Sequence, residues 1–474
     1  MSDWQEAEQR VERAHELYER GRWEEAVSEL RRAIEINPNI SAWYFNLGLT
    51  LDMMERFEEA LTAYQHALEI DPDDLELLVA AGADCVRTGQ YRPSIRFFER
   101  AESIDPSFEP CYCNRIVAYS ELGDHERAEE MFYLARQYRE KCPICYYNMG
   151  ASLFARGIYD KALWCWRQVL EIEPDYPQVH ARMADVHWAK GQLPEARRHL
   201  IEELRSDPGN VDTLLDLGEL LMEMDQRTAA AEKFRQVLDL DPEECTAHYQ
   251  LGILAEGEGD YRQALEKFKF VLARDSHFGG AHLQIAQIYY RIKNRAEALH
   301  HANCELAQRD LDEQNLLELG HLFMDLGQLD SAQTAFRRLL ETNPRNADAR
   351  HSLAVSMLLA GRLDEGVAQC KLALKIQPKY MLAMSNLALA YLSKRDCVRA
   401  RYWLREALDI APDDPQLRQI SQRLRLESLR VHTLALPAMF RRLIRKVLRR
   451  RDHSGRVGNS GKSGFKSVKH GPGG

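Results

Sequence analysis

Long hydrophobic runs and targeting signals are missing from this 474-residue chain. No segment approaches the roughly 18 uninterrupted apolar residues that a membrane-spanning helix needs. The first six residues, MSDWQE, contain no basic region followed by an apolar run. We therefore expect a cytoplasmic protein. Cysteines are few and scattered, ten in all, which favours reduced, buried thiols over a disulfide framework.

Catalytic motifs are missing as well. The sequence contains no glycine-rich nucleotide fingerprint, no H-E-x-x-H pair and no nucleophile elbow. The string GNSGKS at residues 458–463 resembles the end of a phosphate-binding loop, but Arg456 stands where the first glycine of that motif belongs. We expect a non-enzyme without a cofactor.

Charge is distributed unevenly along the chain. Residues 437–474 hold 11 Lys or Arg and one acid, a charge of +10, so residues 1–436 carry −20 of the formal total of −10. An acidic body repels phosphate backbones. Nucleic acid is therefore an unexpected partner except through the basic C-terminal segment.

Prolines are also few, but their spacing is regular. Nine of the 17 fall on a 34-residue grid, and the three other grid points hold Glu140, Ser276 and Asp310. The nine are Pro38, Pro72, Pro106, Pro174, Pro208, Pro242, Pro344, Pro378 and Pro412. Placing this proline at position 32 of a repeat gives twelve repeats, which start at residues 7, 41, 75, 109, 143, 177, 211, 245, 279, 313, 347 and 381. Because proline lacks an N–H and disfavours helix in the preceding residue, it ends the second helix of a repeat.

Small residues recur at fixed positions of the repeat. Position 8 is glycine or alanine in every repeat except the fourth, which has Ile116, and position 20 is alanine, serine or glycine throughout. Two helices can approach closely at such positions. Glycine at position 15 supplies the left-handed backbone that ends the first helix in eight repeats: Gly21, Gly89, Gly123, Gly157, Gly191, Gly259, Gly327 and Gly361.

Small residues at 8 and 20, bulky residues at 17 and 24 and proline at 32 resemble the tetratricopeptide repeat family over residues 7–414. The resemblance implies an all-α solenoid of about twelve helix-turn-helix repeats, wound into a right-handed superhelix with the first helices on its concave face. Residues 1–6 form a lead-in. Residues 415–434 have the apolar spacing of a capping helix, through Leu417, Ile420 and Leu424. We predict a protein-interaction scaffold or adaptor; regulation of a separate enzyme is an alternative.

In this family, positions 5, 6 and 12 of the first helix lie on the concave face. Position 6 is mostly polar: Asn46, Asn114, Asn148, Asp216, Gln250, Gln284 and Asn386. Side-chain amides both donate and accept hydrogen bonds, so a ladder of them can hold the backbone of an extended peptide. Positions 5 and 12 add Phe45, Tyr147, Phe154, Trp188, Tyr249 and Tyr290 as candidate anchors. Aromatic residues at helical spacing are also typical of a core, and an exposed position tolerates any polar residue. Positions 5 and 9 carry no Lys or Arg, which argues against a clamp for a C-terminal carboxylate.

The C-terminal segment 437–451 alternates apolar and basic pairs at helical spacing. Its candidate binding residues are Phe440, Arg441, Arg442, Leu443, Arg445, Lys446, Arg449, Arg450 and Arg451. A helix with one apolar and one cationic face suits an anionic membrane surface or a partner's groove. RNA attraction and folding back onto the acidic body are alternatives, and residues 452–474 are expected to be disordered and rich in Gly, Ser and Lys.

Four cysteines are grouped within two neighbouring repeats. Cys111 and Cys113 precede Cys142 and Cys145, and because Cys111 and Cys145 share repeat position 3, stacking should bring them together. Four thiolates can hold zinc. The spacing matches no standard zinc module, however, and the redox motif that Cys142–Cys145 imitates lacks its strand–helix context, so we predict no metal site.

Overall fold

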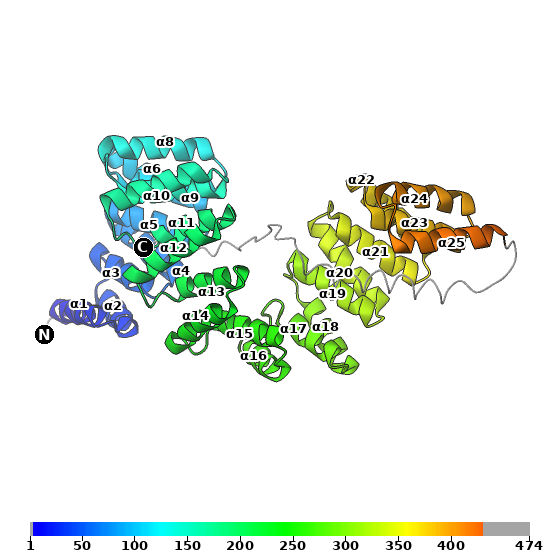
Figure 1. Cartoon of the computed structure of the whole chain (residues 1–474). Helices are drawn as coiled ribbons and strands as arrows, with labels where there is room; N and C mark the ends of the chain where they lie inside the picture. Colours follow the sequence, from blue (N-terminus) through cyan, green and yellow to red (C-terminus); the bar gives the residue numbers. More distant parts are fainter. Residues whose placement is uncertain (1–2, 430–474) are drawn as a thin grey trace. The chain divides into compact units, whose positions relative to one another are not determined.

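The computed structural model describes residues 3–429, and their side chains from residue 4 to 425. In this range the secondary structure consists of 25 α-helices and no strand. The all-α repeat architecture predicted from the sequence is confirmed (Figure 1). Helices pack in pairs from α1/α2 to α11/α12 and from α15/α16 to α23/α24, and α25 follows the last pair. None of the helices described is long and apolar enough to cross a membrane.

Contacts between Cα atoms divide the chain into two compact parts, one ending at Gln226 and the other beginning at Arg227. The helices of the first part are α1 (Asp3–Glu19), α2 (Trp23–Ile36), α3 (Ser41–Asp52), α4 (Phe57–Ile70), α5 (Leu75–Arg87), α6 (Tyr91–Ile104), α7 (Pro110–Glu121), α8 (His125–Tyr138), α9 (Pro143–Ala155), α10 (Tyr159–Ile172), α11 (Val179–Ala189), α12 (Leu193–Ser206) and α13 (Val211–Glu223).

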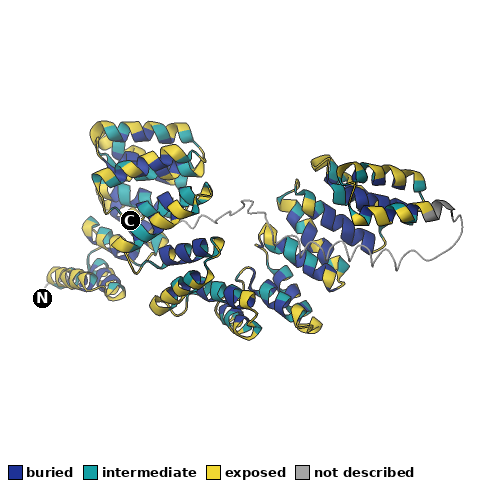
Figure 2. Cartoon of the chain, viewed as in Figure 1, coloured by how far each residue is buried: buried dark blue, intermediate teal, exposed yellow. Residues whose placement is uncertain are grey.

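The helices of the second part are α14 (Arg227–Leu240), α15 (Cys245–Glu258), α16 (Tyr261–Arg274), α17 (Ala281–Arg291), α18 (Arg295–Ala307), α19 (Glu313–Asp325), α20 (Leu329–Thr342), α21 (Ala347–Leu359), α22 (Leu363–Ile376), α23 (Met381–Ser393), α24 (Cys397–Ile410) and α25 (Pro415–Leu429). Within each part the helices stack in chain order, and Figure 2 shows their buried residues on the faces that meet.

Close contact between the two helices of a repeat depends on positions 8 and 24. A Cβ added at Gly150 would lie 2.5 Å from Nε1 of Trp166, and one added at Gly252 would lie 2.7 Å from the ring of Phe268. Glycine therefore stands where the facing residue is a buried aromatic ring. The sequence-based prediction of a close approach at position 8 is explained by these ring contacts.

The turn inside each repeat has a left-handed residue at position 15. All eight predicted glycines have positive φ there; Gly259, for example, has φ 86° and caps α15. Four repeats without glycine keep this conformation at the same position, with φ between 56° and 66°: Glu55, Asp225, Lys293 and Arg395. These four repeats thus keep the left-handed turn without the glycine that favours it.

The N-terminal end of the repeat array differs in detail from the predicted boundary. The first helix begins at Asp3 rather than at residue 7, so most of the expected lead-in is helical. At the other end, α25 contacts α23 and α24 and buries Leu417, Ile420 and Leu424. Residues 430–434 of the predicted cap, the basic segment 437–451 and the tail 452–474 lie outside the described residues.

Candidate functional site

The first helices of successive repeats touch one another as well as their own second helices. In the first part, α5 contacts α7, α7 contacts α9 and α9 contacts α11; in the second part, the same holds along α15, α17, α19, α21 and α23. Elements on the inner side of a curved stack lie closer together than those on the outer side. Each part therefore has an inner face made of first helices, the helices that carry the candidate groove residues.

The polar residues at position 6 are not equally accessible. Asn46 is exposed, Asn114, Asn148, Asp216, Gln250 and Gln284 are half-buried, and Asn386 is buried. Nδ2 of Asn114 donates to the carbonyl of Pro110 at 3.0 Å, and Nδ2 of Asn148 donates to that of Cys113 at 3.0 Å. Each amide still has a second N–H and a carbonyl oxygen for a ligand.

Three of the aromatic candidates lie on the neighbouring first helices α9 and α11. Tyr147, Phe154 and Trp188 are half-buried. The ring of Tyr147 lies 5.6 Å from that of Tyr176, and its hydroxyl lies 3.4 Å from Nε of Arg182. Tyr147 and Phe154 pack against the core and are also partly accessible. The groove role of the three residues stays a prediction.

Polar side chains border this aromatic group. Nε1 of Trp188 donates to the carboxylate of Glu223, and Arg182 forms an ion pair with Asp185 at 3.4 Å. Sequence reasoning missed Arg182, because it considered cations only at positions 5 and 9. Arg182 occupies position 6, where the predicted groove residues are amides or Asp216.

The remaining aromatic candidates are half-buried too. Phe45 packs against Tyr64, with ring centroids 5.9 Å apart, and Tyr249 lies between Phe268 and Phe278 at 5.4 and 5.2 Å. Burial raises the pKa of Tyr249 far above its usual value. Tyr290 packs against the core cluster that contains α17, α19 and α21.

Further along the second part, the inner faces of α21 and α23 are buried rather than accessible. Asn386, predicted to face a partner, is only 1% exposed, and its Nδ2 lies 2.7 Å from Nε2 of His351. Val355 and Leu389, four and three residues further along the two helices, are buried as well. Asn386 thus differs from the expected groove residue, because its amide bonds a side chain of the neighbouring first helix.

Two repeats contain a buried polar group that the sequence reading missed. In the sixth repeat, Nδ1 of His180 lies 3.1 Å from Nδ1 of His199, and Glu203 accepts the backbone N–H groups of Gln178 and Ala181 at 2.7 and 3.2 Å. Burial, followed by the neighbouring imidazoles, lowers the pKa of His199 to about 4. His199 is therefore neutral at physiological pH.

The same group recurs in the ninth repeat, three repeats later. His282 and His301 face each other with 2.8 Å between their Nδ1 atoms, and Glu305 accepts the N–H groups of Gly280 and Leu283 at 2.7 and 3.1 Å. Both glutamates occupy repeat position 27, where the other repeats have Ala, Val or Leu. A glutamate in place of an apolar residue at position 27 is the sequence signal that could have revealed this group.

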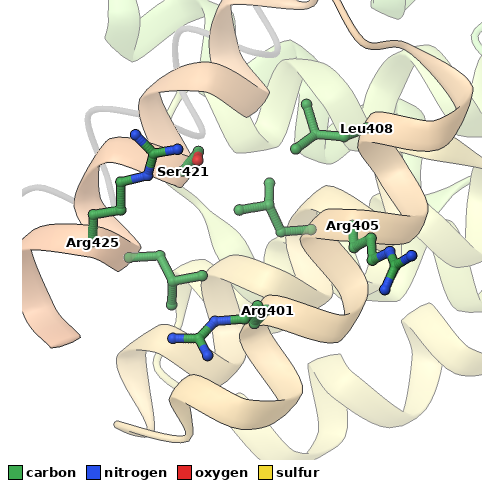
Figure 3. Close-up of a pocket in the computed structure, with 7 residues that line it drawn as sticks. Arg401, Arg405, Leu408, Ser421 and Arg425 are labelled. Atoms are coloured by element: carbon green, nitrogen blue, oxygen red, sulfur yellow. The ribbon is translucent and has the colours of Figure 1, made fainter.

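A cavity of about 240 Å³ lies between α24 and α25. Leu404, Leu408 and Leu424 contribute apolar surface, and Figure 3 shows the guanidinium groups of Arg401, Arg405 and Arg425 around it, pointing in different directions. Because these charges do not converge, the cavity is not built as an anion site.

The four grouped cysteines are arranged differently from the prediction. Cys145 meets Cys113 in a disulfide, not Cys111, whose Sγ instead donates to the carbonyl of Phe108 at 2.9 Å. The expectation of reduced thiols throughout is therefore wrong at one pair; the eight other cysteines are free. Cys142 lies beside the pair, with its Sγ 3.5 Å from that of Cys113. Burial raises the pKa of the Cys142 thiol to about 12.

Comparison with known proteins agrees with this architecture. Family models described as tetratricopeptide repeat match residues 17–73, 181–244, 215–261, 249–313, 317–380 and 374–415, and one described as TPR repeat matches 150–191. Among solved structures, the yeast Tom70 crystal structure aligns with 84% of this chain and 98% of its own at a TM-score of 0.46 and 14% identity.

The matches to curated relatives cover only part of each relative. Protein CTR9 homolog of Arabidopsis thaliana is 24% identical over 325 residues, 57% of this chain and 30% of the relative. TPR repeat-containing protein YpiA of Bacillus subtilis is 22% identical over 206 residues, 43% of this chain and 48% of the relative. This chain thus spans less than half the length of either. Since the family models together match more than half of the sequence, and the helix pairs follow the same 34-residue period, the chain belongs to the tetratricopeptide repeat family.

Proposed function

We propose that this chain is a non-catalytic scaffold that binds extended segments of partner proteins along the inner face of its first helices, foremost on α9 and α11. Tetratricopeptide repeats generally serve protein interaction. The observation that carries the proposal is the half-buried aromatic group Tyr147, Phe154 and Trp188, which lies among polar side chains on that face.

The chemistry of this surface favours a particular kind of segment. A ring held by the core on one edge offers rigid apolar contact area at little cost in side-chain entropy. The amide of Asn148, which lies beside Tyr147, offers groups that pair with a peptide backbone. Glu223 adds negative charge beside Trp188, whereas Asp185 is paired with Arg182. We therefore expect an extended segment that combines an apolar anchor with basic residues.

The proposal can be tested by removing the two central rings together. Tyr147→Ala with Trp188→Ala should weaken capture of specific partners from the native cells by more than about tenfold, since buried aromatic anchors carry most of the energy of an interface. The matched control is Tyr133→Ala on the second helix α8, where the ring is 60% exposed. The control should capture partners as the unchanged chain does.

Thermal unfolding of the same variants separates binding from stability. The proposal requires that the double variant unfold close to the unchanged chain while its partners are lost. Loss of partners together with a large fall in the midpoint would assign the rings to the core and contradict the proposal, as would capture that is unaffected.

The C-terminal segment supplies the alternative functions. Membrane or RNA association through residues 437–451 is tested with a chain ending at residue 436: loss of liposome sedimentation or of salt-sensitive RNA retention would locate that function in the segment. Regulation of a separate enzyme would appear as one enzyme among the specific partners. The expected cytoplasmic location belongs to the same proposal.

A further inference from the structure

Three sulfur atoms and one carboxylate converge between α7 and α9. Oε1 of Glu109 lies 2.6 Å from Sγ of Cys113, 2.5 Å from Sγ of Cys142 and 3.3 Å from Sγ of Cys145. All four ligand atoms lie within 4.8 Å of one another, and the three cysteines are at most 2% exposed. Core filling accounts for a single buried cysteine such as Cys111, but it gives no reason for three sulfurs to surround one carboxylate oxygen.

We propose that the chain, with its cysteines reduced, binds one zinc ion between Glu109, Cys113, Cys142 and Cys145. Zinc accepts sulfur and carboxylate oxygen as ligands, and structural zinc sites are closed by four protein groups in a tetrahedron. With Zn–S bonds of about 2.3 Å, the sulfurs of such a tetrahedron lie about 3.8 Å apart. The Cys113–Cys142 distance of 3.5 Å is already close to this value.

The helix starts explain why these residues meet. Glu109 and Cys142 are the residues that precede α7 and α9, and Cys113 and Cys145 lie in the first turn or just after it. Sγ of Cys142 also accepts the backbone N–H of Cys145 at 3.3 Å. Three thiolates and a carboxylate leave the zinc site with two negative charges, and the positive ends of two helix dipoles favour such an anion.

The disulfide and the zinc ion compete for the same sulfurs. Opening the Cys113–Cys145 disulfide requires two electrons and two protons and yields two thiols. A phosphine supplies the electrons and takes an oxygen atom from water, becoming the phosphine oxide. Zinc then binds the three sulfurs as thiolates, and the three thiol protons pass to solvent. The ion would join the first helices of the fourth and fifth repeats, which the disulfide also joins.

The experiment uses the full-length chain, reduced with a phosphine without oxygen, freed of metal by a chelator and titrated with Co²⁺. We expect one equivalent to produce thiolate-to-cobalt charge-transfer absorption and the intense visible bands of tetrahedral cobalt, both removed by one equivalent of Zn²⁺. Cys142→Ser should abolish these bands and weaken zinc binding by more than about 100-fold, since even groups outside the ligand set change affinity 10- to 100-fold. Glu109→Gln should keep the charge transfer and weaken binding.

Cys111→Ser is the matched control, because Cys111 is equally buried and two residues from Cys113, yet its Sγ donates to the Phe108 carbonyl and does not belong to the cluster. It should bind cobalt as the unchanged chain does. Circular dichroism checks that each variant is helical, and Cys145→Ser replaces Cys142→Ser if the latter does not fold. No charge transfer in the reduced unchanged chain, or equal loss in Cys111→Ser, would overturn the proposal.

Discussion

Replacing Gly252 by alanine tests whether the contact between positions 8 and 24 holds a repeat together. The added Cβ would lie 2.7 Å from Cε1 and 2.9 Å from Cζ of Phe268, whose ring is fully buried. Carbon atoms attract at about 3.5–4.0 Å, so the ring or the helix must move by about 1 Å. Overpacking of this kind costs about 1–3 kcal/mol in a closely packed core.

Gly257→Ala in the same helix is the matched control. A Cβ there would meet only the end of the Arg227 side chain at 3.2 Å, which can move. Both substitutions gain the same helix propensity, about 1 kcal/mol. The two variants should therefore differ by about 1–3 kcal/mol, with Gly257→Ala the more stable. Urea unfolding followed by circular dichroism measures this difference.

A compensating substitution tests the steric explanation directly. Repeats with alanine at position 8 pair it with a smaller residue, as Ala184 does with Leu200 and Ala388 with Leu404. Phe268→Leu should therefore rescue part of the stability lost in Gly252→Ala, although it is destabilising by itself. Equal stability of the two alanine variants, or no rescue by leucine, would refute the steric explanation.

Three further predictions concern single residues. Arg395→Gly should stabilise the second part by up to about 1 kcal/mol in urea unfolding, because φ of 60° strains a residue with a Cβ, whereas Lys394→Gly, at φ −83°, should destabilise it. Because the pKa of His199 is about 4 in the folded chain and about 6.5 in the unfolded one, acidification below pH 6.5 should favour unfolding, by about 2 kcal/mol at pH 5. This loss levels off below pH 4, and His199→Gln should have a flatter pH profile of unfolding midpoints. Glu305→Ala should lower the thermal midpoint by leaving two buried N–H groups unbonded, at a cost of about 1–3 kcal/mol each, whereas Glu341→Ala on the exposed surface should not.

The repeat architecture was predictable because its signals are local and repeated. Glycine at position 15 determines one backbone conformation, and the pairing of Gly150 with Trp166 depends on a spacing that is the same in every repeat. Many weak signals at one period reinforce each other. A single departure, such as Arg395 in place of glycine, leaves the turn unchanged.

The cysteine contacts could not be predicted in the same way. Cys111 and Cys145 share position 3, but α7 and α9 meet with an offset of two repeat positions. Cys113 at position 5 meets Cys145 at position 3, and Oγ of Ser120 at position 12 donates to Oγ of Ser152 at position 10. Glu109 could not be recognised as part of the cluster from the sequence, because an acidic residue before a helix is common. The repeat register determines which helices meet, whereas a contact between individual side chains depends on how the two helices are offset along their axes.

Departures from the repeat pattern are therefore the most informative positions in a chain of this kind. Glu203 and Glu305 replace an apolar residue at position 27, and each binds two N–H groups at a helix start that is opened by a left-handed residue, Gln178 or Gly280. A buried carboxylate is costly without such donors, so the glutamate and the opened turn depend on each other. The fourth repeat, whose position 8 is isoleucine and whose grid point is Glu140, contributes three of the four residues of the cysteine cluster: Glu109, Cys113 and Cys142. At position 27 of the sixth and ninth repeats, a specific polar contact has taken the place of generic apolar packing.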